Sequence, residues 1–212
     1  LSDALSNLKT RLLNFPFVEH DDIVDAFSML LLFVFMDKRY SVYGRAFNES
    51  NICKVSSVLN LGYSTVFFNR EGDNWKAIEI AVKYGSETTL YVAKETHFRA
   101  SVEEGLAKLK EFAPTKNVFI DCSAAEGLRG MNNSRVTVER YEENDFDKSV
   151  AQLNLAFAKK RVILDEACKL TKADVENFKF SKSKDENVKF STKKDGFVAC
   201  LRIALKYYGG IV

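Results

Sequence analysis

The sequence has few of the residues that build disulfide frameworks and zinc sites. Its four cysteines, Cys53, Cys122, Cys168 and Cys200, are widely spaced and form no C-x-x-C pair, and the chain contains only two histidines. A structural zinc site needs about four Cys or His ligands at short spacings, and a disulfide framework needs organised pairs, so neither is predicted. Free thiols in a reducing cytosol fit this pattern best.

The chain also lacks a long hydrophobic segment. Its longest apolar run, Met29 to Met36, is far shorter than the roughly 20 residues that cross a bilayer. It has neither the basic flank nor the cleavage site of a signal peptide. No G-x-x-x-x-G-K-[ST] sequence occurs, so no P-loop nucleotide site is expected. We expect no membrane partner.

What is present is the composition of an ordinary α/β protein. Of the 212 residues, 46% are hydrophobic, 28% are charged and only two are proline, which suits one domain with a full core. The net charge is only +2, but basic residues gather in the C-terminal third of the chain. Such a basic surface is one way to bind nucleic acid, and a solvated face is the alternative.

The apolar pattern predicts strands interspersed with helices. Strands are expected near residues 54–60, 63–70, 74–83 and 88–95, at 117–121 and 135–139, and over "RVILD"; helices are expected over 21–37, 101–112, 147–159, 170–178 and 195–208. The segment Glu71–Asn74, "EGDN", predicts a hairpin turn. The expected fold class is α/β, with a mixed central β-sheet, the Asn60 strand in its middle and helices on both faces.

Three polar residues lie where separate predicted elements end or begin. Asn60 ends the strand over 54–60, Asp121 ends "NVFID", and Asp195 begins the last helix. A two-metal nuclease needs oxygen ligands from separate elements that converge on two cations about 4 Å apart, and such ligands suit Mg²⁺ or Mn²⁺. Each residue also has a simpler interpretation: a turn residue, a turn cap and a helix N-terminal carboxylate, respectively.

From about Tyr43 to Tyr208 the chain resembles the C-terminal nuclease domain of viral large terminases, the DNA-packaging motors of tailed bacteriophages. The segments that carry this resemblance, in chain order, are "VLNLGYST", "LYVAKETHF", "VFIDCSAAEGLRGM", "DKSVAQLNLAFAKKRVILDEAC" and "KKDGFVACLRIAL". The resemblance implies an RNase H-like fold over residues 51–212, and it implies that residues 1–50 are a linker or the end of a preceding motor domain.

The resemblance further implies a metal-dependent endonuclease that cuts concatemeric double-stranded DNA at the initiation and termination of genome packaging. Asp121 would be the second ligand and Asp195 the third ligand of two Mg²⁺ or Mn²⁺ ions, and Asn60 stands in place of the first. An amide oxygen can bind a hard cation but brings no negative charge, so we expect Asn60 to impair the site. Ala199 stands where the family often has aspartate, and Glu95 is a weaker ligand candidate.

The partners implied are double-stranded DNA, a portal protein, a small terminase subunit and an ATPase domain of the same polypeptide, within a packaging complex in the host cell cytoplasm. Basic residues are expected to contact DNA phosphates without reading sequence. These are Lys182, Lys184, Lys189, Lys193, Lys194 and Arg202.

Two other interpretations remain open at this point. The chain could be a non-catalytic RNase H-like module that docks the motor on portal or DNA, or a different RNase H-like enzyme such as a resolvase or a proofreading exonuclease. Near the N-terminus, His20, Asp21, Asp22 and Asp25 could form a metal cluster, but helix capping is the favoured role of these acids.

Overall fold

A computed structural model describes residues 42–44, 46–55, 64–85, 88–123, 136–141, 146–178 and 196–208. The predicted helix over 21–37, the acidic cluster at 20–25 and most of the predicted strand over 54–60 lie outside these residues. Within them, no helix is both long enough and apolar enough to cross a membrane.

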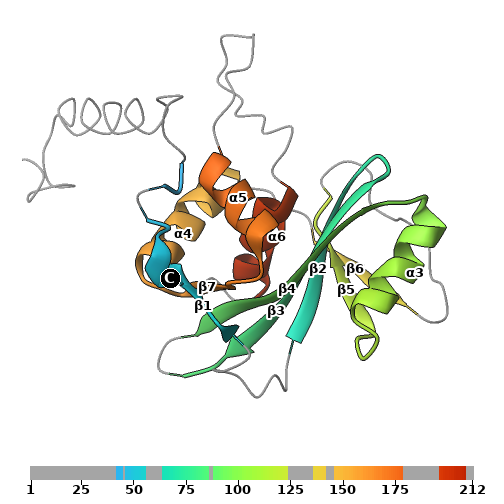
Figure 1. The fold of residues 1–212 in the computed structure, drawn as a ribbon, viewed down its shortest axis with the longest axis horizontal. Helices are drawn as coiled ribbons and strands as arrows, with labels where there is room; N and C mark the ends of the chain where they lie inside the picture. The colour runs from blue at the N-terminus through green and yellow to red at the C-terminus, as the bar shows by residue number, and fades with distance from the viewer. Residues whose placement is uncertain are drawn as a thin grey trace, which may run out of the picture. The chain divides into compact units, whose positions relative to one another are not determined.

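The described strands form one seven-stranded mixed sheet in the order β1-β7-β4-β3-β2-β5-β6 (Figure 1). Its centre is an antiparallel meander, and shorter strands pair in parallel on both sides of it. The strand bounds are β1 Ile52–Cys53, β2 Ser64–Glu71, β3 Asn74–Lys83, β4 Thr89–Arg99, β5 Val118–Asp121, β6 Thr137–Arg140 and β7 Val162–Asp165.

The β2–β3 hairpin has the turn that the sequence predicts. Glu71 pairs with Asn74, and Gly72 between them adopts a φ of 58°, a conformation that glycine reaches without a Cβ clash. Because side chains alternate along a strand, this register sends Phe67 and Ile78 to one face and Phe68 and Ala77 to the other.

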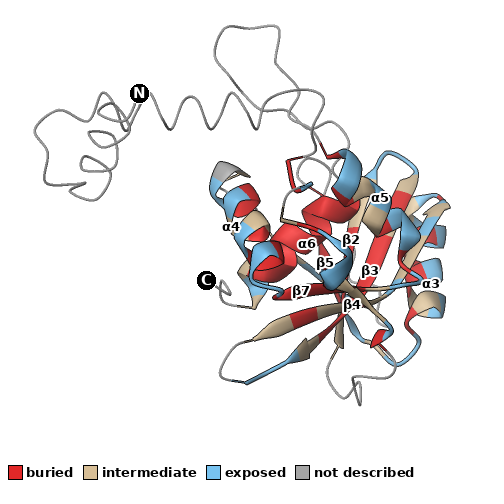
Figure 2. Ribbon diagram, turned by 60° about the vertical axis from the view of Figure 1, so that its left-hand side comes forward, coloured by how far each residue is buried: buried red, intermediate tan, exposed pale blue. Residues whose placement is uncertain are grey.

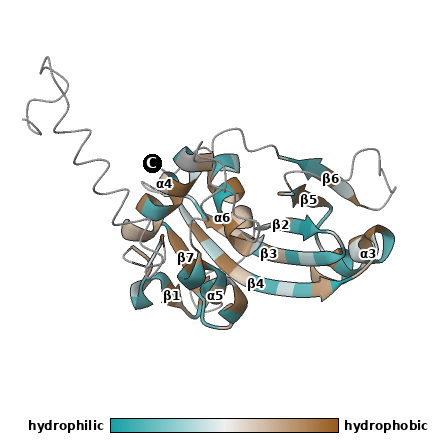
Figure 3. Ribbon diagram, turned by 90° about the horizontal axis from the view of Figure 1, so that it is seen from above, coloured by the Kyte–Doolittle hydropathy of each residue, from teal (hydrophilic) through white to brown (hydrophobic). Residues whose placement is uncertain are grey.

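Helices cover both faces of the sheet, as predicted. On one face lies α3 (Val102–Phe112), and on the other lie α4 (Phe146–Ala158), α5 (Lys169–Asn177) and α6 (Gly196–Tyr207). Every residue of α6 from Gly196 to Leu205 is buried, which makes it the central helix of its layer (Figure 2). Apolar residues accordingly gather on α6 and β7 in Figure 3.

The α3 face is organised around Trp75. Its ring stacks between Phe68 and Phe98, with centroid distances of 5.4 and 5.9 Å, and its indole nitrogen donates to the Ala100 carbonyl at 3.1 Å. Gly105 of α3 lies directly against this indole, since a Cβ built there would be 2.4 Å from the ring. The glycine therefore sets how closely α3 approaches the sheet.

Residues before β1 pack into the same folded unit. Tyr43 and Phe47 place their rings 5.7 and 5.0 Å from that of Phe157 in α4. Asn51 is fully buried and donates its amide to the carbonyls of Phe157 and Val162, at 2.9 and 3.2 Å. The described residues between 42 and 50, which the sequence analysis assigned to a linker or the end of a preceding motor domain, thus contribute to the core.

We expect Gly105→Ala to destabilise the protein by about 1–3 kcal/mol, because the added methyl overpacks the indole of Trp75. This loss should appear although alanine favours a helix over glycine by about 1 kcal/mol. Urea unfolding measures it, with the exposed Ala107→Gly in the same helix as the control for propensity alone. Unchanged or higher stability of Gly105→Ala would contradict the close contact.

We also expect stability to fall at alkaline pH. Burial raises the pKa of the Cys168 thiol from 9.0 to about 12, with a smaller contribution from the carboxylates of Glu95 and Asp165. The folded state therefore keeps a thiol proton that the unfolded chain loses at high pH. The resulting contribution to the free energy of unfolding is complete below pH 9 and disappears as the pH approaches 12. The loss of unfolding free energy between about pH 8 and about pH 10.5 should be smaller in Cys168→Ala than in the parent. Equal losses would contradict the assignment.

Candidate functional site

The candidate site lies where β2 and β5 end. These neighbouring strands run parallel, with Phe68 opposite Asp121, so their carboxyl ends share one edge of the sheet. The backbone of Cys122 continues this pairing by donating to the Phe68 carbonyl at 2.7 Å. The residues that follow Phe68 in β2 therefore lie beside the residues that follow Asp121.

Asp121 occupies the end of β5 that the sequence predicts, and its side chain organises the next turn. The residue is 1% exposed, and its Oδ1 accepts the backbone N–H of Ser123 at 2.9 Å. The Ser123 hydroxyl in turn accepts the N–H of Arg70 at 2.7 Å, which ties this turn to β2. The turn-capping role is thus present, and a carboxylate has the capacity to bind a cation as well.

Asn69 is a polar residue beside the Asp121 turn that the sequence pattern did not single out. It follows Phe68 at the carboxyl end of β2, and its side-chain amide donates to the Cys122 carbonyl at 3.3 Å. Asn60, predicted as the first ligand at the end of the strand over 54–60, precedes β2 in the chain and lies outside the described residues. One sequence feature could have pointed to Asn69: it lies near the end of the predicted strand over 63–70, directly before the hairpin turn.

Lys76 of β3 is the antiparallel partner of Asn69, so the two side chains point to the same face. The Lys76 ammonium lies 2.6 Å from an oxygen of Asp174 in α5 and 5.0 Å from the ring centroid of Phe197 in α6. The same Asp174 oxygen accepts the Phe197 N–H at 3.3 Å. These contacts hold the start of α6 over Lys76 of β3, which lies opposite Asn69 near the end of β2.

Asp195, the third predicted ligand, directly precedes the first residue of α6 but lies outside the described residues. Its role as a ligand remains a prediction. Ala199, one turn further along the same helix, is buried in the core.

Glu95, the weaker ligand candidate of the sequence analysis, caps a helix in the structure. Its two oxygens accept the backbone N–H groups of Leu170 and Thr171, at 2.8 and 2.6 Å, at the start of α5. Both oxygens therefore satisfy helix N–H groups that have no partner within the helix. Glu95 caps α5 instead of facing Asp121.

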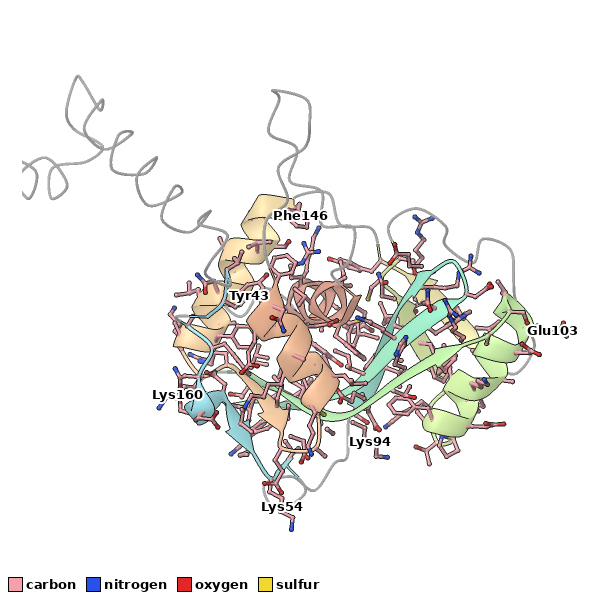
Figure 4. All side chains as sticks on the ribbon, turned by 45° about the horizontal axis from the view of Figure 1, so that its top comes forward. Tyr43, Lys54, Lys94, Glu103, Phe146 and Lys160 are labelled. Atoms are coloured by element: carbon pink, nitrogen blue, oxygen red, sulfur yellow. The ribbon has the colours of Figure 1, made fainter. Side chains whose placement is uncertain are left out.

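Arg202 is placed differently from the phosphate contact expected for it. The residue is 2% exposed, its guanidinium donates to the Ser149 hydroxyl at 3.0 Å, and it lies 4.2 Å from the ring centroid of Phe146. Phe146 stands at the start of α4, where Figure 4 labels it. Arg202 thus joins α6 to α4 in the interior. The five lysines between 182 and 194 lie outside the described residues.

The described part of the site has few ligands for metal ions. Among the described residues, no group of three or more His, Cys, Asp or Glu side chains is placed to hold a metal. The donors at the edge are the Asp121 carboxylate and the Asn69 amide, whose oxygen suits a hard cation but carries no charge. Because side chains alternate, Asp121 shares the face of Phe68 and Asn69 shares the face of Phe67, so these two residues do not by themselves form a cation site.

Comparison with known proteins identifies the fold. No family model matches the sequence, and no curated protein matches it. Among solved structures, a large terminase from a thermophilic bacteriophage aligns with 79% of this chain at 15% identity and a TM-score of 0.62. The alignment covers 45% of that terminase, so the chain spans less than half of its length.

Two isolated nuclease domains align over most of their own length. The P22 large terminase nuclease domain matches 79% of this chain and 93% of its own, at 12% identity and a TM-score of 0.57. The large terminase nuclease from the thermophilic phage G20c, solved with bound magnesium, matches 68% of this chain and 82% of its own, at 12% identity and a TM-score of 0.50. The chain therefore has the RNase H-like fold of phage large terminase nuclease domains, which confirms the fold class expected from the sequence.

Proposed function

We propose that this chain is the nuclease module of a DNA-packaging terminase large subunit, which cuts concatemeric double-stranded DNA when genome packaging starts and ends. The observation that carries the proposal is the parallel pairing of β2 and β5, which brings Asn69 and Asp121 to one sheet edge beside the start of α6. Support comes from the fold shared with terminase nuclease domains.

Phosphodiester hydrolysis here would depend on Mg²⁺ or Mn²⁺ held by Asp121 and Asp195, with a weak contribution from the Asn69 amide oxygen. A bound divalent cation supplies an activated water and stabilises the leaving oxygen. The chain's own contribution is positional. The turn hydrogen bond to Ser123 fixes the Asp121 carboxylate, and the Asp174–Lys76 contact fixes the start of the helix that follows Asp195.

The partners proposed for this module follow from the same function. They are double-stranded DNA, a portal protein, a small terminase subunit and an ATPase domain of the same polypeptide, in the cytoplasm of an infected cell. DNA contacts would come mainly from Lys182, Lys184, Lys189, Lys193 and Lys194 and would be independent of sequence.

A second function is favoured by one specific observation. The edge residue of β2 is a neutral amide, and its cross-strand neighbour is a lysine. A neutral amide brings no charge to hold a divalent cation, and the neighbouring ammonium is already paired with Asp174; both features suit a non-catalytic module that docks the packaging motor on DNA or portal. Cleavage assays with added metal separate the two functions.

We expect Asn69→Asp to raise both Mn²⁺ affinity and the rate of plasmid nicking. A unit charge about 4 Å from another in a partly exposed site contributes at most about 4 kcal/mol. Since each 1.4 kcal/mol is a factor of ten, the gain in affinity should lie between about tenfold and about a thousandfold. A manganese titration and a supercoiled-plasmid time course measure both effects.

Asn60→Asp is the matched control, because it tests the position predicted from the sequence. If Asn69 is the first-ligand position, Asn60→Asp should leave affinity and rate at parental values. A gain in affinity and rate confined to Asn60→Asp would identify residue 60 as the first-ligand position. No gain in either variant would favour the non-catalytic module.

The DNA contacts make a separate prediction. Replacing the five lysines between 182 and 194 by glutamine should weaken DNA binding and flatten its salt dependence, by about 0.9 in log–log slope for each phosphate that is no longer neutralised. Arg202→Gln should instead lower the free energy of unfolding, because it removes buried contacts to Ser149 and Phe146. Fluorescence anisotropy at several salt concentrations measures the loss of DNA binding, and urea unfolding measures the loss of stability. A reduced salt slope in folded Arg202→Gln would contradict this division.

A further inference from the structure

α5 is a short helix whose first turn has no capping side chain of its own. It spans nine residues, Lys169–Asn177, and no acidic residue occurs in its first turn. Within the described part of the chain, Cys168 at the N-cap position makes no side-chain capping hydrogen bond. Isolated helices shorter than about 12 residues are marginal in water, because the first turn orders several residues for a single hydrogen bond. The start of α5 therefore depends on groups from elsewhere in the protein.

Glu95 of β4 provides those groups. Its two carboxylate oxygens lie 2.8 Å from the Leu170 nitrogen and 2.6 Å from the Thr171 nitrogen, so both N–H groups have an acceptor. A carboxylate at this end of a helix also interacts favourably with the helix dipole. Thr171 is fully buried, so water cannot replace Glu95 as the acceptor unless the turn opens.

Asp174 of α5 has the same role at the start of α6, the helix beside it (Figure 1). One of its oxygens accepts the N–H of Phe197, the second residue of α6, at 3.3 Å and lies 2.6 Å from the Lys76 ammonium. No acidic residue occurs in the first turn of α6 itself. Gly196 lies against the Lys76 side chain, since a Cβ built on this glycine would be 2.5 Å from Lys76 Cδ. A carboxylate of α5 therefore helps to hold the first turn of α6.

The two caps are coupled because α5 is so short. Asp174 is the sixth residue of this helix, and beyond the turn that Glu95 caps fewer than about two turns remain to hold it. We propose that α5 couples Glu95 to the first turn of α6, which makes Glu95 a positioning residue for the helix that follows Asp195. The inference goes beyond the proposed function and stands without it, because it concerns the order of a helix start.

The test is amide hydrogen exchange, measured by NMR on the full chain. Glu95→Met keeps the length of the side chain and removes both acceptors, so protection of the Leu170 and Thr171 amides should fall by about tenfold, as for the loss of a typical cap. Protection of the Phe197 amide should fall in the same variant by up to the same factor, although its own acceptor is Asp174. Asp174→Ala should lower protection at Phe197 and leave Leu170 and Thr171 at parental values, because alanine favours the helical state of α5.

Lys172→Met is the matched control, since it changes the same turn of α5 and removes surface ion pairs to Glu49 at 3.2 Å and to Glu176 at 3.9 Å. It should leave protection at Phe197 unchanged. The Ile78 amide in β3 reports unfolding of the whole molecule and should remain more protected than Phe197 in every variant, so that exchange at Phe197 measures local opening.

Glu95→Gln keeps one acceptor oxygen and should give a smaller loss at the same three amides, which serves if Glu95→Met does not fold. Unchanged protection of Phe197 in both variants would show two independent caps and overturn the proposal. A loss at Leu170 and Thr171 in Asp174→Ala, or a loss at Phe197 in Lys172→Met, would also overturn it, because each indicates a general loosening of α5. A loss at Phe197 that follows the change at Glu95 supports the coupling whether or not the chain cuts DNA.

Discussion

The burial of α6 across β2 and β3 is the constraint on which the site depends. All residues from Gly196 to Leu205 are buried, so this helix is covered on every side over that length. The sheet covers one side of it, and α4 and α5 flank it. Each fully buried large apolar side chain contributes about 1.5–3 kcal/mol, so this helix has little freedom to move. Its first turn is consequently fixed over Lys76, which lies opposite Asn69 near the end of β2.

The opposite face of the sheet fixes the register that this arrangement requires. Trp75 stacks between Phe68 and Phe98 and packs on Gly105, so the β2–β3 hairpin is held from the α3 side. A register slip of one residue would send Trp75 to the other face and separate Asn69 from Lys76. The aromatic core under α3 and the polar edge under α6 are therefore two consequences of one strand pairing.

The fold of a nuclease domain and the chemistry of its edge are separate properties in this chain. The fold is that of terminase nuclease domains, while the edge combines an amide, a carboxylate and a lysine–aspartate pair. Folds host sites of different activity because a few side chains at strand ends change without disturbing the core. The interest of this protein lies in how the electrostatics of one such edge are balanced.

The sequence by itself determined most of the elements, because their signals are local. Alternation predicted the strand at 74–83, which coincides with β3, and Ser101 and Pro114 bracketed α3 as expected. "NVFID" likewise predicted a strand that ends at Asp121. Only the tertiary structure decided which strand ends meet: parallel pairing placed the carboxyl end of β2, and so Asn69, beside Asp121. It also turned Glu95 into a cap of α5 and buried Arg202 between α4 and α6. Partners separated by dozens of residues are chosen by packing and register, and no local pattern encodes that choice.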